Sequence, residues 1–534
     1  MPSVDMEDAT ECFYKSVISS SKGLAEITKA KQPTVQFIHE SVRDFLIKDR
    51  GLAEIWPDFK LDWESLGHDK LKRVCNSYLR LCVLHKHDIS EDQKYWDKLN
   101  LKKEYPFMEY AGQHVLYHAD SAASTYCQEE FLRSFPTRDW IEIVNKFEKF
   151  KVRRYTRAAP LFYTLADRGY SSLIRGRLKS DPSIINRRYD QERYVYALIA
   201  AMAKGHKDSV LALLGLSSPL HNGIDVLEGM TSSIDSNCRG ETPLTWACEH
   251  GYVGVAKLLV QRDSPRNARR GWTLLMHAAK GGRYETAKWL ISIGEDIRAT
   301  VSSDSAVSLA VVNHHPKIVG LLIDHGIEAD STACLETPLL CEALTRGQTY
   351  LARLILQKGG NPNIQIEGGR RPIHFAHDTD AIEALVEYGA DITAQDDEGN
   401  TCLHLTRGMN HHHNIKSFLK HGADANAKNL QGQTWLHSLT FLFGEYRSAV
   451  QDSLREGTDI NARDNDGNTP LHIASSKPDV WTLRVWLKLG ANVNARNNKG
   501  ETPLDITRRR NDVDGCKTLR EAGGLTGSEI DSLQ

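Results

Sequence analysis

Long hydrophobic runs are missing from this sequence of 534 residues. No stretch approaches the ~20 consecutive apolar residues of a membrane-spanning helix, so we expect no membrane span. The opening residues, MPSVDMEDATECF, are acidic and lack the apolar core of a secretory signal. We therefore expect the chain to act in the cytoplasm, with the nucleus as the alternative.

Paired cysteines and a charge imbalance are also missing. The 10 cysteines are scattered singly with no CxxC pair, which favours reduced thiols over a disulfide framework. Lys and Arg number 67 against 69 Asp and Glu, so the formal net charge is −2. Without a positive excess, direct binding of nucleic acid is not expected.

Catalytic signatures are the third absence. The sequence contains no GxxxxGK[ST] phosphate loop, no GxSxG nucleophile elbow and no DHHC tetrapeptide. Three adjacent histidines, 411–413, lie near His404, but adjacent side chains point in different directions and no carboxylate or cysteine completes a tetrahedral ligand set. We therefore expect no enzyme activity, no cofactor and no metal site.

The sequence does contain a phrase that recurs to its end. Thr-Pro-Leu occurs at 242–244, 337–339, 469–471 and 502–504, and weaker copies begin at Thr273, Ser305, Arg371, Thr401 and Thr434. Successive starts are 31, 32, 32, 34, 30, 33, 35 and 33 residues apart. This near-constant period predicts one supersecondary unit repeated along the chain.

Each letter of the phrase has a physical role. Thr469 can cap the free amides of a first helix, and Pro470 suits its first position because the missing N–H needs no partner there. Gly467 lets the preceding turn reach positive φ, and Gly251 ends the first helix of the unit at Thr242. The apolar positions of that unit are Leu244, Ala247, Val255, Leu258 and Leu259.

Four histidines occupy one slot of the phrase, three residues after its start: His374, His404, His437 and His472. A slot that repeats with the architecture points to a structural role. We therefore expect these side chains to hydrogen-bond to the adjoining turn rather than to act in catalysis.

The phrase and its period resemble the ankyrin repeat, in which a β-turn and two antiparallel helices form one stackable unit. Two degenerate units, from Pro160 and Tyr196, lack the phrase but keep the spacing from helix start to glycine, which brings the count to 11. The resemblance implies an all-α fold with an ankyrin solenoid and β-turn fingers over 156–525. An insertion near 215–239 is expected to be a surface loop, and 526–534 a polar C-terminal tail.

Residues 1–155 differ in kind from the repeats. They are richer in aromatic residues and lack the period, so a small helical domain is predicted to precede the solenoid. The string VQFIHESVRDFL at 35–46 predicts a short strand running into a helix. Further helices are expected over 68–84 and 105–119.

The same region resembles a fungal receptor segment. FIHESVRDFL at 37–46, Cys75 with Tyr78-Leu79, and YPFMEYAGQHVLYHA at 105–119 are similar to the segment that links the NTPase core to the ankyrin array in fungal NACHT-type signal-transduction ATPases. The resemblance implies a fungal origin and a recognition or regulatory setting. Because the phosphate loop of that family is absent from this sequence, the chain would be a sensor or scaffold without the ATP switch.

A stack of repeats offers a long concave surface that the core does not need. Turn residues before each Thr and residues that end each first helix face outward along one side, so they are free to meet a partner. In the units that begin at Thr242 and Thr273 these candidates are Arg239, Glu241, Glu249, Arg269, Arg270, Trp272 and Lys280.

Trp272 is the candidate anchor of this surface. At an exposed turn its large apolar area would suit a binding hot spot, whereas the alternative is packing against the neighbouring finger. Four arginines between 262 and 270 lie beside it; a solvated charged face is the default, and an acidic or phosphorylated protein segment is the partner they would fit.

The sequence therefore favours a non-catalytic protein-interaction scaffold or recognition module of a fungal regulatory system. One alternative is an accessory or enzyme-like protein of a fungal pathway, with a small-molecule pocket between the N-terminal domain and the first repeats. Another is a nuclear co-regulator that acts through a protein partner. The partner's identity and the oligomeric state do not follow from the sequence.

The missing phosphate loop predicts that the purified chain neither binds nor hydrolyses ATP. Without a glycine-rich cradle and its lysine, nothing neutralises a triphosphate. Titration of labelled ATP with Mg²⁺ is expected to give no saturable signal in the micromolar range. Saturable binding, or phosphate release above a buffer control, would contradict the expectation.

Overall fold

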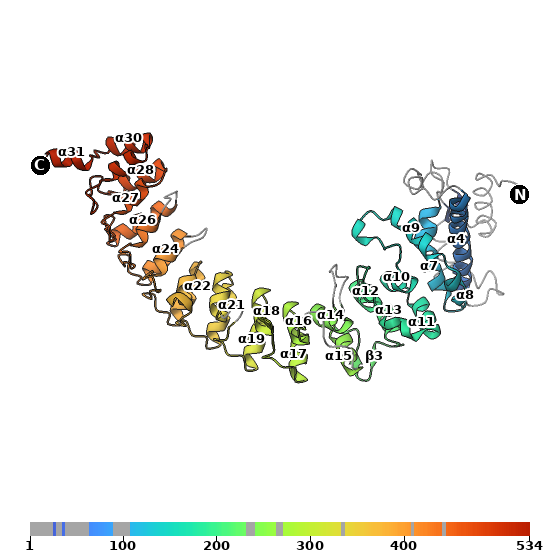
Figure 1. Ribbon diagram of the computed structural model, residues 1–534. Helices are drawn as coiled ribbons and strands as arrows, with labels where there is room; N and C mark the ends of the chain where they lie inside the picture. Colours follow the sequence, from blue (N-terminus) through green and yellow to red (C-terminus); the bar gives the residue numbers. More distant parts are fainter. Residues whose placement is uncertain are drawn as a thin grey trace. The chain divides into compact units, whose positions relative to one another are not determined.

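The computed structural model describes residues 25–27, 35–37, 63–88, 107–230, 241–262, 271–332, 337–406, 411–439 and 445–533 (Figure 1). The chain divides into two compact units. Unit 1 comprises Met1–Pro219 and Thr231–Arg239, and unit 2 comprises Leu220–Met230 and Gly240–Gln534. Over its described residues each unit is mostly helical, as the sequence predicted.

Unit 1 begins with a short hairpin and a group of helices. Strand β1 (Ala25–Ile27) pairs antiparallel with β2 (Val35–Phe37), which confirms the strand expected from Val35; the helix expected after it lies outside the described residues. The helices and the 3-10 turn that follow are α4 (Trp63–Asp88), α7 (Met108–Ala122), α8 (Glu129–Ser134), α9 (Thr137–Phe147) and η1 (Lys151–Arg153). Both helices expected in this region are present, α4 being longer and α7 starting three residues later than predicted.

Helix α7 forms the centre of this region. It packs against α4 and α9, and its buried side chains include Val115 and Leu116. Trp140 of α9 is almost completely buried and donates its indole N–H to the carbonyl of Gly112 at 2.7 Å. The indole therefore satisfies its polar group while its ring fills the core.

The two degenerate repeats complete unit 1. Their helices and a 3-10 turn are α10 (Leu161–Arg168), α11 (Ser171–Ser180), η2 (Pro182–Asn186), α12 (Ala197–Ala203) and α13 (Lys207–Leu213). Helix α7 packs on α11, where Asp120 accepts a hydrogen bond from the backbone N–H of Leu173 at 2.9 Å. The N-terminal helices and the first two repeats thus share one compact unit, and the boundary near residue 155 stays a prediction.

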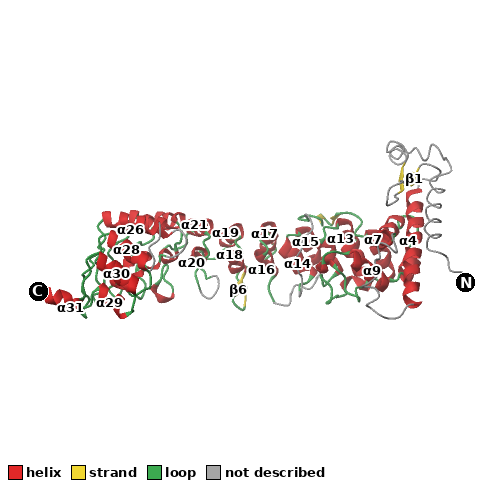
Figure 2. Ribbon diagram, turned by 90° about the horizontal axis from the view of Figure 1, so that it is seen from above, coloured by secondary structure: helices red, strands yellow, loops and turns green. Residues whose placement is uncertain are grey.

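Nine further helix pairs are described in unit 2, and Figure 2 shows them following one another along the stack. They are α14 (Pro243–His250) with α15 (Val253–Gln261), α16 (Leu274–Lys280) with α17 (Tyr284–Ser292), α18 (Ala306–Val312) with α19 (Pro316–Asp324), α20 (Leu339–Thr345) with α21 (Thr349–Gln357), η4 (Pro372–Phe375) with α22 (Thr379–Glu387), α23 (Cys402–Leu405) with α24 (His411–Lys420), α25 (Trp435–Ser438) with α26 (Glu445–Arg455), α27 (Pro470–Ser475) with α28 (Val480–Lys488), and α29 (Pro503–Arg509) with α30 (Val513–Glu521). With the two pairs of unit 1, these make the 11 repeats that the sequence predicted.

The helix pairs of unit 2 stack in two layers. The first helices contact one another in succession from α14 to α29, and we call them the first-helix layer. The second helices, α15 to α30, form the second-helix layer, with contacts from α17 to α26 and between α28 and α30. The largest buried side chains of this stack include Trp246, Trp435, Trp486, Tyr252 and Phe418.

The beginnings and ends of the helices follow the sequence phrase. Thr242 accepts a hydrogen bond from the backbone N–H of Thr245 at 3.2 Å, and Pro243 is the first residue of α14. Gly251 ends that helix with a φ of 85°, as predicted. Thr469 is the N-cap of α27, as predicted, and it forms a capping box with His472, whose Nδ1 accepts the Thr469 backbone N–H at 3.1 Å and lies 2.9 Å from its hydroxyl. The side chain of His472 therefore satisfies the N–H of the N-cap residue itself.

The insertion is more ordered than a surface loop over its described part. Strands β3 (Leu220–His221) and β4 (Ile224–Asp225) pair antiparallel, and the following segment packs on α15. A Cβ on Gly254 would lie 1.9 Å from the carbonyl oxygen of Asp225, so only glycine permits this approach. Glu228 accepts from Lys257 at 2.8 Å. Residues 220–230 lie mostly on the surface, but they form a short hairpin and bury Val226 and Met230; residues 231–239 lie outside the described residues.

A second short hairpin occurs in unit 2, and the chain ends in a helix. Strands β5 (Thr300–Val301) and β6 (Asp304–Ser305) pair antiparallel before α18, and a 3-10 turn η3 (Glu367–Gly369) precedes η4. Residues expected as a polar tail form α31 (Gly527–Leu533). Glu529 accepts the backbone N–H of Thr526 at 2.8 Å and Thr526 accepts that of Glu529 at 3.2 Å, so this reciprocal cap starts a helix where a tail was predicted.

The histidine slot joins one repeat to the next. In His404, His437 and His472, Nδ1 accepts the backbone N–H of the phrase's threonine at 3.0–3.1 Å. The other ring nitrogen, Nε2, lies 2.9–3.1 Å from the backbone carbonyl that precedes the next repeat's threonine. His374 makes the same bond to its own repeat start, at 2.9 Å from the N–H of Arg371. The structural role predicted for this slot is confirmed.

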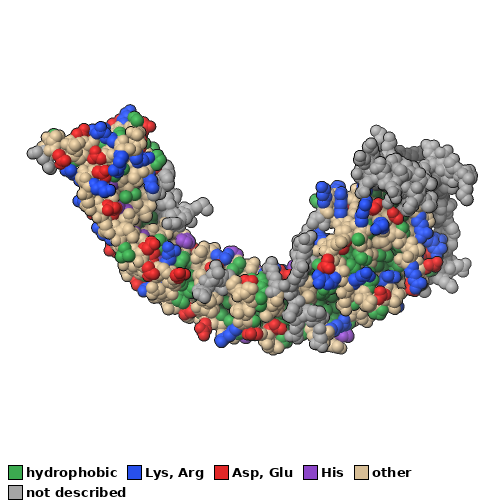
Figure 3. Space-filling view, in the orientation of Figure 1, with side chains coloured by type: hydrophobic (Ala, Val, Ile, Leu, Met, Phe, Trp, Pro, Cys, Tyr) green, Lys and Arg blue, Asp and Glu red, His purple; other side chains and the backbone are tan. Residues whose placement is uncertain are grey.

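Backbone hydrogen bonds also connect successive fingers in the C-terminal repeats. Asn465 N–H donates to the carbonyl of Gln431 at 3.0 Å, and Asn498 N–H donates to that of Asp466 at 2.9 Å. On the face drawn in Figure 3, acidic and basic side chains are interspersed over these repeats. Over the described residues, no helix has the combined length and apolar character needed to cross a bilayer.

Core truncation tests the repeat register. Leu471 is completely buried in α27, so Leu471→Ala is expected to cost about 2 to 5 kcal/mol. Because each repeat contacts mainly its neighbours, denaturant unfolding followed by circular dichroism should become multiphasic. A single sharp transition at the wild-type midpoint would place Leu471 outside a repeat core.

The three histidines that contact two successive repeats, which we call the histidine bridges, predict that the stability of the fold depends on pH. Burial lowers the pKa of His404, His437 and His472 from the usual 6.5. Below about pH 6.5 the unfolded chain therefore binds more protons than the folded one, so this contribution to stability is present above pH 6.5 and is lost as the pH falls below it. The thermal midpoint measured in small pH steps should fall by several degrees from pH 7 to 5.

The matched control for this prediction is a chain without two of the bridges. Asp120 has the opposite effect on the pH dependence of stability, because burial raises its pKa to about 6. The informative quantity is therefore the difference between the wild type and the variant in how far the thermal midpoint falls. The combined variant His437→Gln and His472→Gln should show a smaller drop in midpoint than the wild type. An equal drop would assign the pH dependence to other groups.

Candidate functional site

Four of the seven predicted surface residues are described, and they lie together in unit 2. Arg239, Arg269 and Arg270 lie outside the described residues. The described four are Glu241, Glu249, Trp272 and Lys280. They surround His277, which the sequence reading did not select, and we call these five residues the Glu-His cluster.

Two adjacent repeats supply the cluster. Glu241 directly precedes the N-cap of α14, and Glu249 lies in the last turn of the same helix. His277 and Lys280 come from α16, the first helix of the next repeat. The stacking of α14 on α16 therefore brings together side chains that lie 28 to 39 positions apart in the sequence.

The polar atoms of the cluster are close enough for direct interaction. His277 Nδ1 lies 3.2 Å from Glu249 Oε2 and 3.5 Å from Glu241 Oε2. Lys280 Nζ lies 2.6 Å from the other oxygen of Glu249, Oε1. The His277 side chain is 1% exposed, whereas those of Glu241 and Glu249 are 19% and 15% exposed. The imidazole is thus buried beside two glutamate side chains that are partly exposed.

The two carboxylates have different environments. Burial alone would raise the pKa of Glu249, but its hydrogen bonds with His277 and Lys280 outweigh burial and hold that pKa at about 2. Burial raises the pKa of Glu241. Among the described residues, neither Glu241 Oε2 nor His277 Nε2 has a hydrogen-bond partner. The cluster therefore holds one well-paired carboxylate and one desolvated carboxylate beside the same imidazole.

Trp272 is not the exposed anchor that the sequence suggested. Its side chain is only 5% exposed, and its ring meets that of His277 edge to face at a centroid distance of 5.5 Å. Lys280 Nζ lies 5.8 Å from the centre of the indole. The finger position that looked exposed is covered by the adjoining helix, so the indole forms a wall of the cluster.

His277 was missed because its slot is apolar in the neighbouring repeats. The residue four positions after the phrase start is Trp246, Leu309 or Cys341 in three other repeats, and each is buried. The sequence did contain one signal for His277, because a histidine occupies a position that holds apolar core residues in those other repeats. The identity of its partners was not available, because they belong to the preceding repeat.

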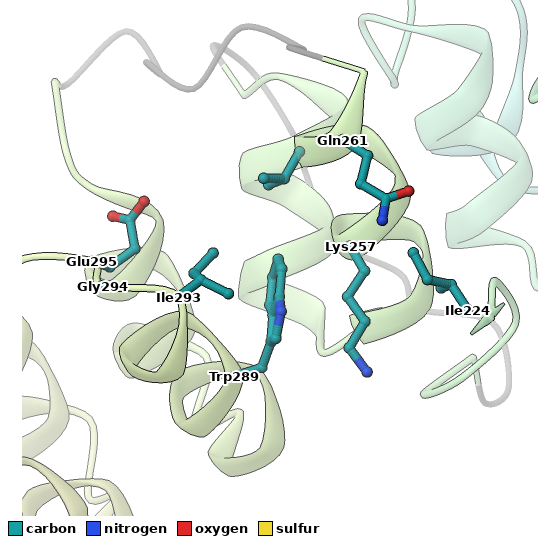
Figure 4. Close-up of a pocket in the computed structure, with 8 residues that line it drawn as sticks. Ile224, Lys257, Gln261, Trp289, Ile293, Gly294 and Glu295 are labelled. Atoms are coloured by element: carbon teal, nitrogen blue, oxygen red, sulfur yellow. The ribbon is translucent and has the colours of Figure 1, made fainter. Parts of the chain in front are cut away.

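A separate cavity of about 430 Å³ lies between α15 and α17 in the second-helix layer (Figure 4). Trp289 and Ile293 from α17 and its C-terminal end face Lys257 of α15, with Ile224 of the hairpin beyond it. Val260, Gln261, Gly294 and Glu295 complete the lining. Its size lies within the range of small-molecule sites, but its walls carry few convergent polar groups.

A smaller polar cavity of about 260 Å³ occurs in unit 1, where the sequence placed the alternative pocket. Its lining includes Asn145, Tyr155, Asp167 and Arg168. These groups bond to one another: the Tyr155 hydroxyl donates to Asp167 at 2.6 Å and accepts from Arg168 at 3.3 Å. Its volume lies below the range of about 300 to 1,000 Å³ typical of ligand pockets, so a ligand would have to break this network.

Family comparisons agree with the repeat stack. The family described as "Ankyrin repeats (3 copies)" matches residues 166–268, 197–301, 262–333 and 307–396. "Ankyrin repeat" matches 398–430, and "Ankyrin repeats (many copies)" matches 454–506. Together with the stacked helix pairs, these matches identify the chain as an ankyrin-repeat protein.

The similar proteins share short stretches with this chain. Human "Ankyrin repeat and KH domain-containing protein 1" is 37% identical over 94 residues, which is 17% of this chain and 4% of that protein. Its Caenorhabditis elegans counterpart, mask-1, is 29% identical over 131 residues, which is 23% of this chain and 5% of the relative. "E3 ubiquitin-protein ligase KEG" of Arabidopsis thaliana is 28% identical over 194 residues, which is 33% of this chain and 11% of the relative. The chain spans only a small part of each relative, so the likeness concerns the repeats.

Proposed function

We propose that this ankyrin-repeat chain is a non-catalytic module that binds a protein partner across the first-helix layer of the repeats at Thr242 and Thr273. Ankyrin repeats imply protein–protein interaction, and the Glu-His cluster is the observation that favours this part of the stack. Its charged groups project from two repeats, so one segment lying across them would contact both. Binding across two repeats suits a partner segment that is an extended or helical peptide.

The absence of catalysis is part of the proposal. Both oxygens of Glu249 are engaged, Oε2 with His277 and Oε1 with Lys280. A general base needs a free acceptor within reach of its substrate, and this carboxylate is committed to its neighbours. The proposal therefore assigns the cluster to binding rather than to proton transfer.

The chemistry of the partner rests on two sets of residues. Lys280 is 34% exposed and offers a cation beside Glu249. Arg269 and Arg270 would add donors that pair with carboxylate or phosphate in bidentate fashion. We therefore propose an acidic or phosphorylated protein segment as the partner, with these three side chains as its contacts.

The proposed setting is a fungal recognition system, in the cytoplasm or as a nuclear co-regulator. The proposed fungal setting is based on the amino-acid sequences of residues 37–46 and 105–119, which resemble the linker of NACHT-type receptors. An accessory role in a fungal pathway is the alternative, and the polar cavity beside Tyr155 and Asp167 is where its ligand would bind. The internal hydrogen bonds of that cavity and its small volume favour the interaction module.

The surface assignment is tested by a pair of double variants. Proteins captured from an extract of the native source are titrated against the purified chain by calorimetry. Arg270→Ala with Lys280→Ala is expected to weaken binding by about 2 kcal/mol, roughly thirtyfold, in a chain that circular dichroism shows to be folded. Trp272 is left in place, because removing a buried indole would lower stability by itself.

The matched control removes the same charge from the opposite layer. Lys288 of α17 and Lys317 of α19 are exposed residues of the second-helix layer, and Lys288→Ala with Lys317→Ala should leave the affinity unchanged. Equal affinities for wild type and both folded double variants would remove the first-helix surface from consideration. A loss confined to the control would move the binding site to the second-helix layer.

A further inference from the structure

The carboxylates and the imidazole of the Glu-His cluster converge at ligand distance from one another. Glu241, Glu249 and His277 each offer one ligand atom, and these three atoms lie within 4.8 Å of one another. We propose that they form a zinc-binding site that links two adjacent repeats. The proposal is independent of the protein partner, because it concerns an ion and the stability of the stack.

The two distances from the imidazole nitrogen to the carboxylate oxygens match those around a tetrahedral ion, and the two carboxylate oxygens lie within 4.8 Å of each other. Zinc binds nitrogen and oxygen ligands at about 2.0 to 2.2 Å, which places neighbouring tetrahedral ligands roughly 3.3 to 3.6 Å apart. His277 Nδ1 lies 3.2 Å from Glu249 Oε2 and 3.5 Å from Glu241 Oε2. An ion between these three atoms would therefore need little movement of the imidazole relative to either carboxylate.

A buried carboxylate oxygen without a partner is the second observation. Glu241 Oε2 is inaccessible to solvent and has no hydrogen bond among the described residues, although it faces a nitrogen of a side chain that is 99% buried. Desolvating a carboxylate oxygen without a compensating bond is costly. A divalent cation at this point would bond to that oxygen and neutralise both glutamates.

The surroundings hold the ligands in position. Lys280 binds the remaining oxygen of Glu249 at 2.6 Å, and Arg283 donates to the backbone carbonyl of Glu249 at 3.1 Å. The edge of the Trp272 ring restricts the imidazole from another side. Hydrogen-bonded ligand carboxylates and a packed shell are what orient metal ligands in known sites.

The donor set favours zinc over the hard cations. Calcium takes six to eight oxygen ligands and magnesium six, mostly carboxylates, carbonyls and water. Two carboxylates and one imidazole suit zinc, with water as the fourth ligand. The partial exposure of Glu241 and Glu249 provides the entry path for the ion and that water.

The ion would act as a clamp within the stack. Two ligands belong to the repeat of α14 and the third to that of α16, so binding is possible only when the two repeats are stacked. A ligand that binds the folded state alone stabilises it by mass action. Zinc should therefore raise the unfolding midpoint of this part of the array.

The test uses the full chain, stripped with EDTA and passed into metal-free buffer. Titration with Zn²⁺ is expected to give a site with a Kd of about 1 µM or below, and saturating zinc should raise the thermal midpoint by about 3 °C or more. Glu241→Gln and His277→Gln should each weaken zinc binding at least about thirtyfold and abolish the shift. Circular dichroism in EDTA verifies that each variant is folded.

Two further measurements keep the assignment specific. Co²⁺ in the site should give the intense visible absorption of a four-coordinate ion and quench Trp272, so that Trp272→Phe reduces the quenching. The histidine run of α24 is the competing location, and a chain with residues 411–413 changed to asparagine should bind zinc as the wild type does. Loss of binding in that chain with retention in His277→Gln would overturn the proposal. So would the absence of any saturable site in the folded wild type, which would leave the cluster as an ion pair.

Discussion

Every other property of this protein depends on one constraint: its helices are too short to bury an apolar face alone. Most helices of the repeats have 7 to 9 residues, and such a pair has no core until another pair covers it. Stacking supplies that cover, and it places α14, α16 and α18 side by side in one layer. The same contact that completes the core also creates the surface on which the Glu-His cluster lies.

Polar contacts decide how tightly neighbouring repeats are joined. In the C-terminal half, neutral histidines such as His437 accept from their own repeat and lie within hydrogen-bonding distance of the next one, and the fingers add backbone bonds. Between the repeats of α14 and α16 the corresponding joint contains carboxylates and His277. The stack thus has neutral histidine contacts between its C-terminal repeats and a charged contact between the repeats of α14 and α16.

Much of the fold was predictable because repeats encode local structure. Thr242, Pro243 and Gly251 set the ends of α14 within one short segment. The regular spacing of the recurring phrase gave the number of repeats. Expectations about exposure were less successful. Trp272, for which the sequence left exposure and packing open, is buried, and residues 220–230, expected as a surface loop, contain a short hairpin and bury Val226 and Met230. In both cases the covering atoms belong to another part of the chain.

The sequence by itself determined the class of fold, the number of repeats, the helix ends and the structural role of histidines such as His472, because each depends on interactions within a few residues or on the period. Only the tertiary structure decided which side chains meet across repeats. Glu241, Glu249 and His277 lie up to 36 positions apart, and no local pattern links them. Their meeting depends on how far α14 and α16 are offset when they stack, and the packing of the whole interface between the two helices sets that offset.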